Sequence, residues 1–330
     1  MERHGARGRV LLAGVLLLGA VAAGCSDPGT SPSSLCDNDG NYLIAFASDR
    51  ATTGQFDIYL YDVESAGFRL LKDLNSLSLA DSSPALSRDG QLVAFVRNPG
   101  TAGGADIYMY ERVSCSYVDI PALNTAGDET EPCFTGDTRR LVFVRDTLGH
   151  RRIRMIRGDT RELVALPGLQ EAAAYDDWSP APDSTGDRIV FVSDREGSPH
   201  LYIYDRTGGT VDSLVTLREP GARDLDPTVT PNGLYLCFAS DRSGEGGFDV
   251  FLSHLDAVPP VAEALPGLNT PGDERQPRLG HSAAYLAYQG RSADSTGWNV
   301  HYYSRSGGIV VSPAALGRAG SDVQPSVRLP

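Results

Sequence analysis

Several features that often mark a function are scarce or absent in this chain of 330 residues. It has one lysine, Lys72, so almost all of its positive charge comes from arginine. The formal net charge is −13, and no cluster of lysine and arginine follows the N-terminal segment. This argues against nucleic acids and anionic lipid surfaces as partners. The chain also lacks C-x-x-C and G-x-S-x-G, which argues against a metal knuckle, a thioredoxin-like site and an α/β-hydrolase nucleophile.

The N-terminal segment has the pattern of an export signal. Three arginines precede the apolar run Val10–Ala23, which is too short for a comfortable membrane span. The run ends in Ala-Ala-Gly-Cys, which resembles a bacterial lipobox. This resemblance implies removal of residues 1–24 as a lipoprotein signal peptide and lipidation of Cys25, with palmitate among the acyl chains. An ordinary signal peptide with an incidental cysteine is the alternative.

The segment 25–40 reads as the lipidated cysteine and a flexible tether, because it is polar, rich in Pro, Gly and Ser, and without periodicity. Ser26 rather than Asp follows Cys25, and in enterobacterial lipoproteins this implies the outer membrane. We therefore expect a cell-envelope protein, held at the outer membrane by its lipid anchor alone and facing the periplasm. Exposure at the cell exterior stays open.

Four cysteines follow Cys25, and an exported chain can form disulfides among them. They are Cys36, Cys115, Cys133 and Cys237. Four cysteines allow three full pairings, and the sequence does not choose among them. Cys237 lies within an apolar strand and also fits a core thiol.

A repeat of 47 to 50 residues runs through the rest of the chain. It is marked by a proline that opens each unit: Pro84, Pro132, Pro180, Pro227, Pro277 and Pro325. An aromatic residue keeps the same step: Phe46, Phe95, Phe143, Phe191, Phe238 and Tyr288. A full unit such as Asp81–Pro121 divides into four short segments rich in β-branched and aromatic residues. Four strands per unit of this length predict a propeller blade.

The unit "P-x-x-S-x-D-G…F-x-S-D-R…D-I-Y" resembles the TolB-type, WD40-like β-propeller repeat over residues 41–330. The resemblance implies an all-β fold of four-stranded antiparallel blades. The chain enters at a second strand and leaves at a first strand, Asp322–Pro330, so the C-terminal strand is expected to join the N-terminal blade. That closure gives a six-bladed propeller without an open edge. Ser34–Gly40 is a competing first strand, which would leave an incomplete seventh blade.

An acid stands three residues before each of the six prolines. These acids are Asp81, Glu129, Asp177, Asp224, Glu274 and Asp322. The sequence Ser-Asp-Arg follows three second strands, with Asp49 and Arg50, Asp194 and Arg195, and Asp241 and Arg242. Both sets are expected on one rim of the ring. A structural interpretation has these loops fastened by backbone and Asp–Arg bonds, while a functional one has an acidic mouth that attracts a cation or a basic peptide.

Other rim features leave alternatives open. Asp128 and Asp273 lie in nearly duplicate loops, Asn124–Pro132 and Asn269–Pro277. They are the best candidates for exposed contacts, although a shared turn geometry explains the duplication equally well. The blades without Ser-Asp-Arg have Val96–Asn98, Val144–Asp146 and Tyr288–Gly290 in its place. If the Asp–Arg bond that fastens the loop is absent in those blades, their parts of the rim are free to differ in structure from the others. Trp178 fits a packed structural residue better than a ligand platform.

No cofactor is expected. The histidines fall at different positions of the repeat, and no EF-hand spacing occurs. Gly-Asp-Glu loops leave Ca²⁺ as an alternative through carboxylate and carbonyl oxygens. No catalytic residue is assigned.

Function rests on the resemblance, which implies a non-catalytic binding or scaffold protein. Its partner is expected to be an envelope protein or peptide at the rim or in the central channel; no oligomeric state follows. TolB proper carries a further N-terminal α/β domain, and only a short tether precedes the first blade here, which argues against a Tol-specific role. The alternative is a propeller lyase or hydrolase that acts on an oligosaccharide or peptide with a channel-bound metal. Convergence of three or more His, Asp or Glu side chains in the channel would favour that alternative.

Overall fold

The computed structural model describes residues 40–99, 104–169, 174–243, 247–316 and 320–329. The predicted signal peptide 1–24, Cys25, Cys36 and nearly all of the tether predicted over 25–40 lie outside this part of the chain. Within the described residues, no helix has the length and apolarity needed to cross a membrane.

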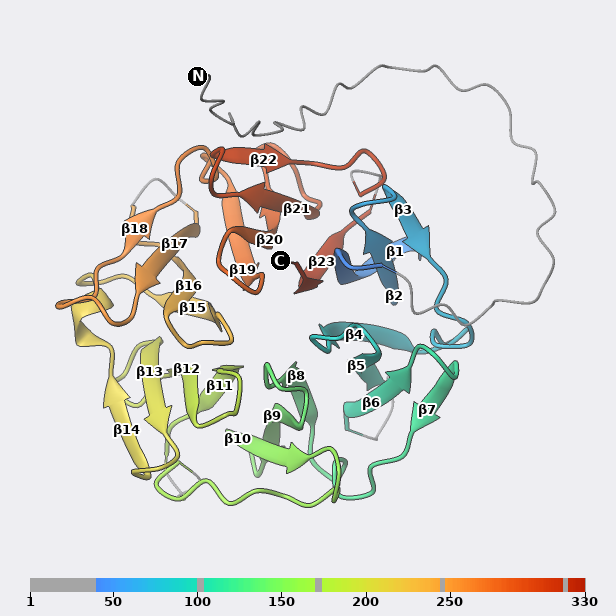
Figure 1. Cartoon of the computed structure of the whole chain (residues 1–330), viewed down its shortest axis with the longest axis horizontal. Coiled ribbons are helices and arrows are strands. Elements are labelled where there is room, and N and C mark those ends of the chain that lie inside the picture. Colours follow the sequence, from blue (N-terminus) through green and yellow to red (C-terminus); the bar gives the residue numbers. More distant parts are fainter. Residues whose placement is uncertain (1–39, 100–103, 170–173, 244–246, 317–319, 330) are drawn as a thin grey trace, which may run out of the picture. The chain divides into compact units, whose positions relative to one another are not determined.

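The described residues form a ring of six antiparallel sheets (Figure 1). In each sheet the first strand lies nearest the ring axis. The first blade contains β23 (Asp322–Arg328), β1 (Leu43–Thr52), β2 (Gln55–Asp62) and β3 (Gly67–Arg69). The second contains β4 (Ala80–Leu86), β5 (Leu92–Asn98), β6 (Asp106–Glu111) and β7 (Ser116–Val118), and the third β8 (Glu129–Phe134), β9 (Arg140–Thr147) and β10 (His150–Arg157).

The other three blades each have four strands. The fourth blade has β11 (Asp177–Pro182), β12 (Arg188–Ser193), β13 (His200–Asp205) and β14 (Thr210–Ser213). The fifth has β15 (Asp224–Val229), β16 (Tyr235–Ser240), β17 (Asp249–His254) and β18 (Glu263–Ala264), and the sixth β19 (Asp273–Leu279), β20 (Tyr285–Arg291), β21 (Asn299–Ser304) and β22 (Ile309–Val311). A short 3₁₀ helix, η1 (Val215–Leu217), follows β14.

The predicted four-stranded blade is confirmed in five of the six sheets. In the third blade the outermost segment pairs with β10 through one isolated bridge, Ile156 with Leu163. Two backbone bonds flank the bridge, from Arg157 N to Glu162 O and from Val164 N to Met155 O. The chain therefore follows the outer edge of this blade without forming a longer ladder.

The predicted ring closure is confirmed. β23 pairs antiparallel with β1, with Leu43 opposite Arg328 and Ser48 opposite Asp322. The C-terminal strand thus supplies the innermost strand of the N-terminal blade. This leaves six blades and gives β1 the partner that the seventh-blade alternative assigned to Ser34–Gly40, of which residues 34–39 are outside the described part.

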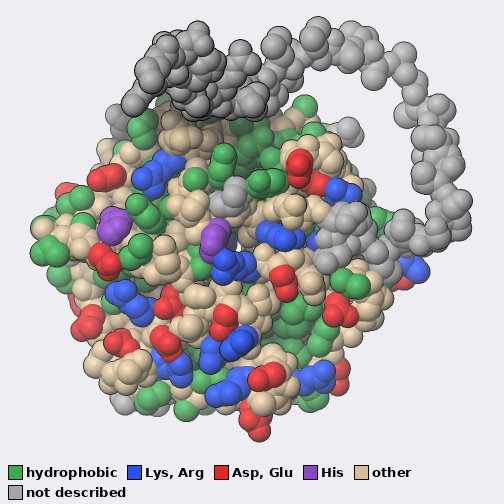
Figure 2. Space-filling view, in the orientation of Figure 1, with side chains coloured by type: hydrophobic (Ala, Val, Ile, Leu, Met, Phe, Trp, Pro, Cys, Tyr) green, Lys and Arg blue, Asp and Glu red, His purple; other side chains and the backbone are tan. Residues whose placement is uncertain are grey.

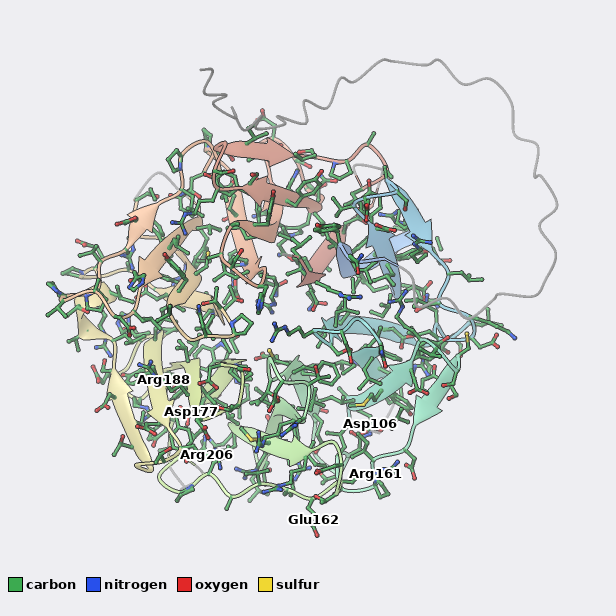
Figure 3. All side chains as sticks on the ribbon, in the orientation of Figure 1. Asp106, Arg161, Glu162, Asp177, Arg188 and Arg206 are labelled. Carbon is green, nitrogen blue, oxygen red and sulfur yellow. The ribbon has the colours of Figure 1, made fainter. Side chains whose placement is uncertain are left out.

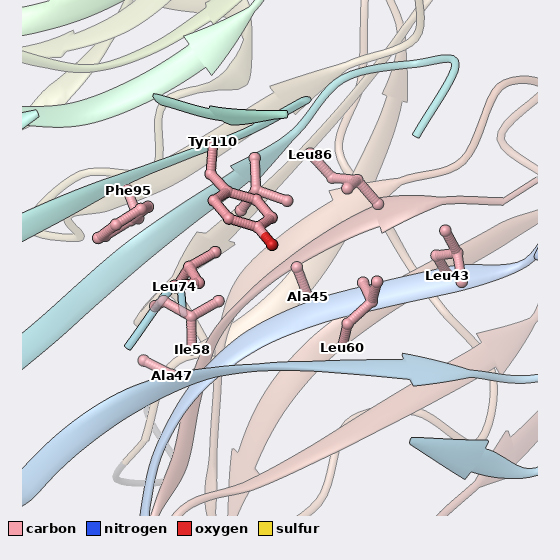
Figure 4. Close-up of a cluster of buried hydrophobic side chains, with 10 residues drawn as sticks. Leu43, Ala45, Ala47, Ile58, Leu60, Leu74, Leu86, Phe95 and Tyr110 are labelled. Atoms are coloured by element: carbon pink, nitrogen blue, oxygen red, sulfur yellow. The ribbon is translucent and has the colours of Figure 1, made fainter. Parts of the chain in front are cut away.

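Hydrophobic side chains fill the spaces between neighbouring blades. One cluster joins Leu43 and Ile58 of the first blade to Leu86, Phe95 and Tyr110 of the second (Figure 4). The repeated aromatic residue of the second strand is central to this packing. Phe46, Phe95, Phe143, Phe191 and Phe238 are each 0% exposed. Burial of one such side chain contributes about 2–3 kcal/mol to stability, so the repeat seen in the sequence is a packing repeat.

The three cysteines in the described residues divide into two groups. Cys115 is disulfide-bonded, whereas Cys133 and Cys237 carry free thiols. Cys237 lies in β16 with no exposed surface and packs in the core between the fifth and sixth blades, as the core-thiol alternative predicted.

Each first strand contains a bulge directly before its proline. The residue there adopts a left-handed backbone conformation in all six blades: Ser83 (φ 49°), Glu131 (52°), Ser179 (48°), Asp226 (53°), Gln276 (49°) and Gln324 (56°). The ladder with the second strand shifts register at the same place. Because a bulge re-aims a side chain, this repeated irregularity decides which residues face the ring axis.

Candidate functional site

The acids before the prolines are buried in all six blades. Their exposed fractions run from 0% for Asp81, Glu129 and Asp177 to 5% for Asp322. Five of them accept bonds from arginines, and the shortest N···O distances are 2.7 Å for Asp81–Arg97, 2.7 Å for Glu129–Arg145, 2.8 Å for Asp177–Arg195, 2.8 Å for Asp224–Arg242 and 2.6 Å for Asp322–Arg50. Figure 3 labels Asp177 in the fourth blade and Glu162, which projects from the outer edge of the ring. A buried carboxylate is costly without such a partner, so the geometry fits the fastener interpretation.

The arginine reaches the acid by two routes. In the blades with Ser-Asp-Arg, a serine lies opposite the acid, and the arginine comes from two residues further along; Ser193 opposite Asp177, with Arg195, is one case. In the second and third blades the arginine itself lies opposite the acid, as Arg97 does for Asp81. The suggestion that Val96–Asn98 and Val144–Asp146 lack the fastener is therefore wrong. Positions two residues apart share one face of a strand, so either position delivers a guanidinium to the same carboxylate.

Each of these arginines also lies on the repeated aromatic ring. The Arg97 Cζ is 5.2 Å from the ring centroid of Phe95 and 4.9 Å from that of Tyr108. The Arg242 Cζ is 5.1 Å from the ring centroid of Phe238. A guanidinium between a buried carboxylate and an aromatic face gains both ionic and cation–π stabilisation. The sequence repeat of acid, aromatic and arginine is one structural unit.

The aspartates of Ser-Asp-Arg fasten a different part of the rim. Asp49 accepts a bond from Ser321 N at 2.7 Å, and Asp194 accepts one from Asp176 N at 2.7 Å. Asp241 accepts bonds from Arg223, through its backbone N at 2.6 Å and its Nε at 2.8 Å. These bonds tie the loop that enters each first strand to the loop that leaves the second.

The duplicate loops share one geometry. Thr125 Oγ1 donates to Glu129 at 2.6 Å, and Thr270 Oγ1 donates to Glu274 at 2.5 Å. The two acids predicted to make contacts in these loops bind backbone N–H groups of the preceding blade: Asp128 accepts a bond from Ala105 N at 2.7 Å. Asp273 accepts one from Phe248 N at 3.1 Å and pairs with Arg291. A contact role for Asp128 and Asp273 stays a prediction, whereas the six buried acids do not form an exposed acidic mouth.

A cavity of about 740 Å³ lies among the first strands of all six blades. Three layers of its lining follow the repeat. The left-handed residues before the prolines form the first layer, and the residues after the prolines form the second: Ala85, Cys133, Ala181, Thr228, Arg278 and Ser326. Arg88 and His281, in the turns after β4 and β19, belong to the third. None of the eight acids predicted for the rim or channel lines this cavity, because the bulges turn other residues of the first strands towards it.

Arginine is the commonest charged residue in this lining. Five arginines line the cavity against two carboxylates, Glu131 and Asp226; the arginines are Arg88, Arg151, Arg275, Arg278 and Arg328. Glu131 accepts a bond from Ser179 N at 2.5 Å. Burial raises the pKa of Glu131, although Ser179 N, Arg151 and Arg278 oppose this rise. Burial likewise raises the pKa of the Cys133 thiol. An alignment of the six repeats on their prolines would have singled out Arg278, because the residue after each of the other five prolines is small.

Trp178 lies at the cavity rather than wholly in the core. It lines the cavity, and the Arg151 Cζ is 4.1 Å from its ring centroid. It also packs against the hydrophobic cluster between the fourth and fifth blades. The expectation of a purely packed tryptophan is therefore incomplete, because one part of Trp178 faces the cavity.

Metal ligands do not converge in the described ranges. No group of three or more His, Cys, Asp or Glu in them is placed to hold a metal ion. The cavity lining contains one histidine, His281, and its Nε2 lies 2.9 Å from Arg88 Nη2.

No protein-family model matches the chain. Among curated proteins, an uncharacterised protein of Agrobacterium fabrum is 27% identical over 115 residues, which are 32% of this chain and 38% of that protein. TolB from Acinetobacter baumannii is similar in structure, with a TM-score of 0.68 and 19% identity over 87% of this chain and 66% of TolB. This chain thus covers less than two thirds of either protein.

Other solved structures share the architecture. The putative TolB from Agrobacterium tumefaciens has a TM-score of 0.60 and 14% identity, over 83% of this chain and 89% of that one. An oligogalacturonate lyase from Vibrio parahaemolyticus has a TM-score of 0.54 and 14% identity, over 83% of this chain and 74% of the lyase. Identities this low establish the fold and leave the activity open. The chain is a six-bladed β-propeller protein with a TolB-like fold.

Proposed function

We propose that this protein is a non-catalytic binding protein of the cell envelope and that a protein partner docks at the mouth of its central cavity. The observation that carries the proposal is the fastened rim around an open cavity. Five buried ion pairs fix the loops that enter the first strands. A surface that is already rigid loses little conformational entropy when it binds, and this favours recognition.

Residues suited to a contact lie at this cavity. Arg151 and Trp178 stack on each other and both line it, and the Arg151 side chain is 37% exposed. Tryptophan and arginine supply a large share of the binding energy in protein interfaces. The similarity to TolB proteins supports a protein partner in general, without naming one.

Location is the second part of the proposal. The pattern of residues 1–25 supports export, cleavage before Cys25 and lipid anchoring at the outer membrane, facing the periplasm. Metabolic labelling with an alkyne analogue of palmitate tests the anchor. Labelled protein is expected for the natural chain, and none for Cys25→Ser. Equal labelling of both would contradict the anchor.

A lyase or hydrolase is the second candidate, because an oligogalacturonate lyase and a puromycin-hydrolysing peptidase share the propeller fold. The channel-bound metal that this candidate assumed has no ligand cluster in the described residues. Depolymerisation of oligogalacturonate by the purified chain, abolished by Arg278→Gln, would favour this candidate over binding.

Site-specific photo-crosslinking in intact cells tests the main proposal. A photoreactive residue is placed at Arg151, at the cavity, and in a matched control at Thr210, on the outer strand β14 of the fourth blade. We expect a discrete protein adduct from position 151 and none from position 210. Adducts of equal yield from both positions, or an adduct from position 210 alone, would contradict docking at the cavity.

A further inference from the structure

The charge of the cavity lining is opposite to that of the chain. The whole sequence has a net charge of −13, yet the lining holds five arginines and two carboxylates. Low-dielectric walls around charges of one sign focus their field and raise the local concentration of counter-ions. The lining therefore attracts anions, although the molecule as a whole does not.

Two of the five arginines are already paired and three are not. Arg151 pairs with Asp176 and Arg275 with Asp226, at 3.0 Å and 2.7 Å. In the described part of the chain, none of the hydrogen bonds of the other three goes to a carboxylate. Arg278 bonds the carbonyl of Pro277, Arg328 bonds Gly40 O and Asn41 Oδ1, and Arg88 bonds Gly136 O and His281. These three guanidinium groups keep donors and charge for a ligand, because each carries five N–H groups.

Arg278 lines the cavity in the second of its three layers. The other five residues of its layer are small: Ala85, Cys133, Ala181, Thr228 and Ser326. Arg278 comes from the sixth blade, and its charge acts on the Cys133 thiol and on Glu131, which belong to the opposite, third blade. A long side chain amid small ones thus places its guanidinium in the space that they leave.

Arg88 and Arg328 both line the cavity at the end where the first strands finish, Arg88 in the turn after β4 and Arg328 as the last residue of β23. Arg88, from the second blade, reaches His281 of the sixth, with 2.9 Å between Nη2 and Nε2, and the carbonyl of Gly136 of the third at 3.5 Å. Arg328 lies against Gly90, since a Cβ there would come within 2.9 Å of Arg328 Nη1. In Figure 2, histidine and arginine side chains adjoin near the centre of the visible face.

These contacts set the size of the ligand. Side chains from three blades meet at this end, so a polypeptide would have to break them to thread through. His281 stands three residues beyond Arg278 in the turn after β19, so at most about 10 Å of chain separates the two. A cavity of about 740 Å³ is in the range of small-molecule sites.

We propose that the cavity binds a small molecule with more than one anionic oxygen group, a polycarboxylate or a phosphate compound. One anionic group lies at Arg278 and another at Arg88 and Arg328. Guanidinium groups bind carboxylate and phosphate through paired, charge-assisted hydrogen bonds. The site does not depend on the protein partner proposed above, since its ligand is small and lies below the mouth.

Calorimetric titration of the full chain with citrate and with inorganic phosphate tests the site and separates the two ligand classes. We expect binding of at least one of them at a 1:1 ratio, weaker at higher salt. Loss of one charge-assisted bond pair weakens binding about tenfold or more. Arg278→Gln and the double variant Arg88→Gln/Arg328→Gln should both show this loss, while Arg278→Lys should keep part of the affinity.

Arg139→Gln is the matched control, because Arg139 is exposed in a neighbouring turn and does not line the cavity. Its affinity should equal that of the natural chain. Fluorescence of Trp178 in a Trp298→Phe background gives a second readout, and thermal unfolding shows which variants are folded. The proposal is overturned if neither anion binds, or if Arg139→Gln weakens binding as much as Arg278→Gln. Binding of hexaglutamate but of neither small anion would also overturn it.

Discussion

Asp322 in the last strand pairs with Arg50 in the first blade, with 2.6 Å between Asp322 Oδ2 and Arg50 Nη2. Ser48 Oγ donates to the other oxygen of Asp322 at 2.5 Å. The bond joins residues 272 positions apart, so Asp322 of β23 fastens the two ends of the propeller to each other within the first blade. In the other four fastened blades, the same bond holds one blade together.

Asp322→Ala is therefore expected to lower the free energy of unfolding by about 3 kcal/mol, because removing one partner of a buried pair leaves an uncompensated charge. Urea denaturation measures the loss. Asp187→Ala is the control, since the Asp187–Arg206 pair is exposed, at 41% and 30%, and its loss should stay within about 1 kcal/mol. Equal losses in the two variants would contradict a closing role for Asp322.

The duplicate loops offer a matched pair of carboxylates. Glu129 accepts bonds from Thr125 and from Arg145, whereas Glu274 accepts bonds from Thr270 and lies opposite Gly290. Glu129→Gln should lower the free energy of unfolding by about 3 kcal/mol, because Arg145 loses its counter-charge. Glu274→Gln should leave it unchanged or raise it. Chemical denaturation at pH 7 compares them, and a larger loss in Glu274→Gln would refute this account of the sixth blade.

The pH dependence of Glu274 follows from its burial, which raises its pKa above the ordinary value of 4.5 for a glutamate. A carboxyl with a raised native pKa stabilises the fold fully below its unfolded pKa, and this contribution is lost as pH rises through the native pKa. The difference in unfolding free energy should therefore shift in favour of Glu274→Gln as pH rises from 4.5 towards 7. A series of denaturation curves across this range measures it; a constant difference would be the opposing result.

Ser179 represents the six left-handed positions, with φ at 48°. Glycine reaches this conformation without strain, whereas a β-branched residue does so at a cost. We expect Ser179→Gly to change the unfolding free energy by less than about 1 kcal/mol and Ser179→Val to lower it by roughly 1–3 kcal/mol. Thermal unfolding of the two variants decides, and equal stability would show that the bulge is not strained by side chains.

The sequence predicted the features that repeat with the blade. The prolines and aromatic residues gave the blade number, and the unmatched terminal strands gave the closure through β23. The acids three residues before the prolines were correctly tied to arginines in three blades. In the second and third blades the partner was missed, because Arg97 and Arg145 stand at another position on the same strand face.

The cavity lining could not be predicted in the same way. A bulge turns Ser83, Glu131 and their equivalents towards the ring axis, and side-chain alternation alone does not show where a ladder shifts. The length of Arg278 matters only because its neighbours around the ring are small, and those neighbours are about 48 residues apart in sequence. Contacts such as Arg88 with His281 depend on the closed ring.

The thiol of Cys133 tests most directly whether the cavity is the binding site. Cys133 and Cys237 both carry free thiols, but Cys133 lines the cavity whereas Cys237 is buried in the core. Mass spectrometry follows the alkylation of Cys133 by N-ethylmaleimide in intact cells and in the purified, dialysed chain. The rate is expressed relative to that of an exposed reference thiol, Ser306→Cys, on the outer hairpin of the sixth blade. Occupation of the cavity predicts labelling several-fold slower in cells than in the purified chain, whereas equal relative rates would contradict the account.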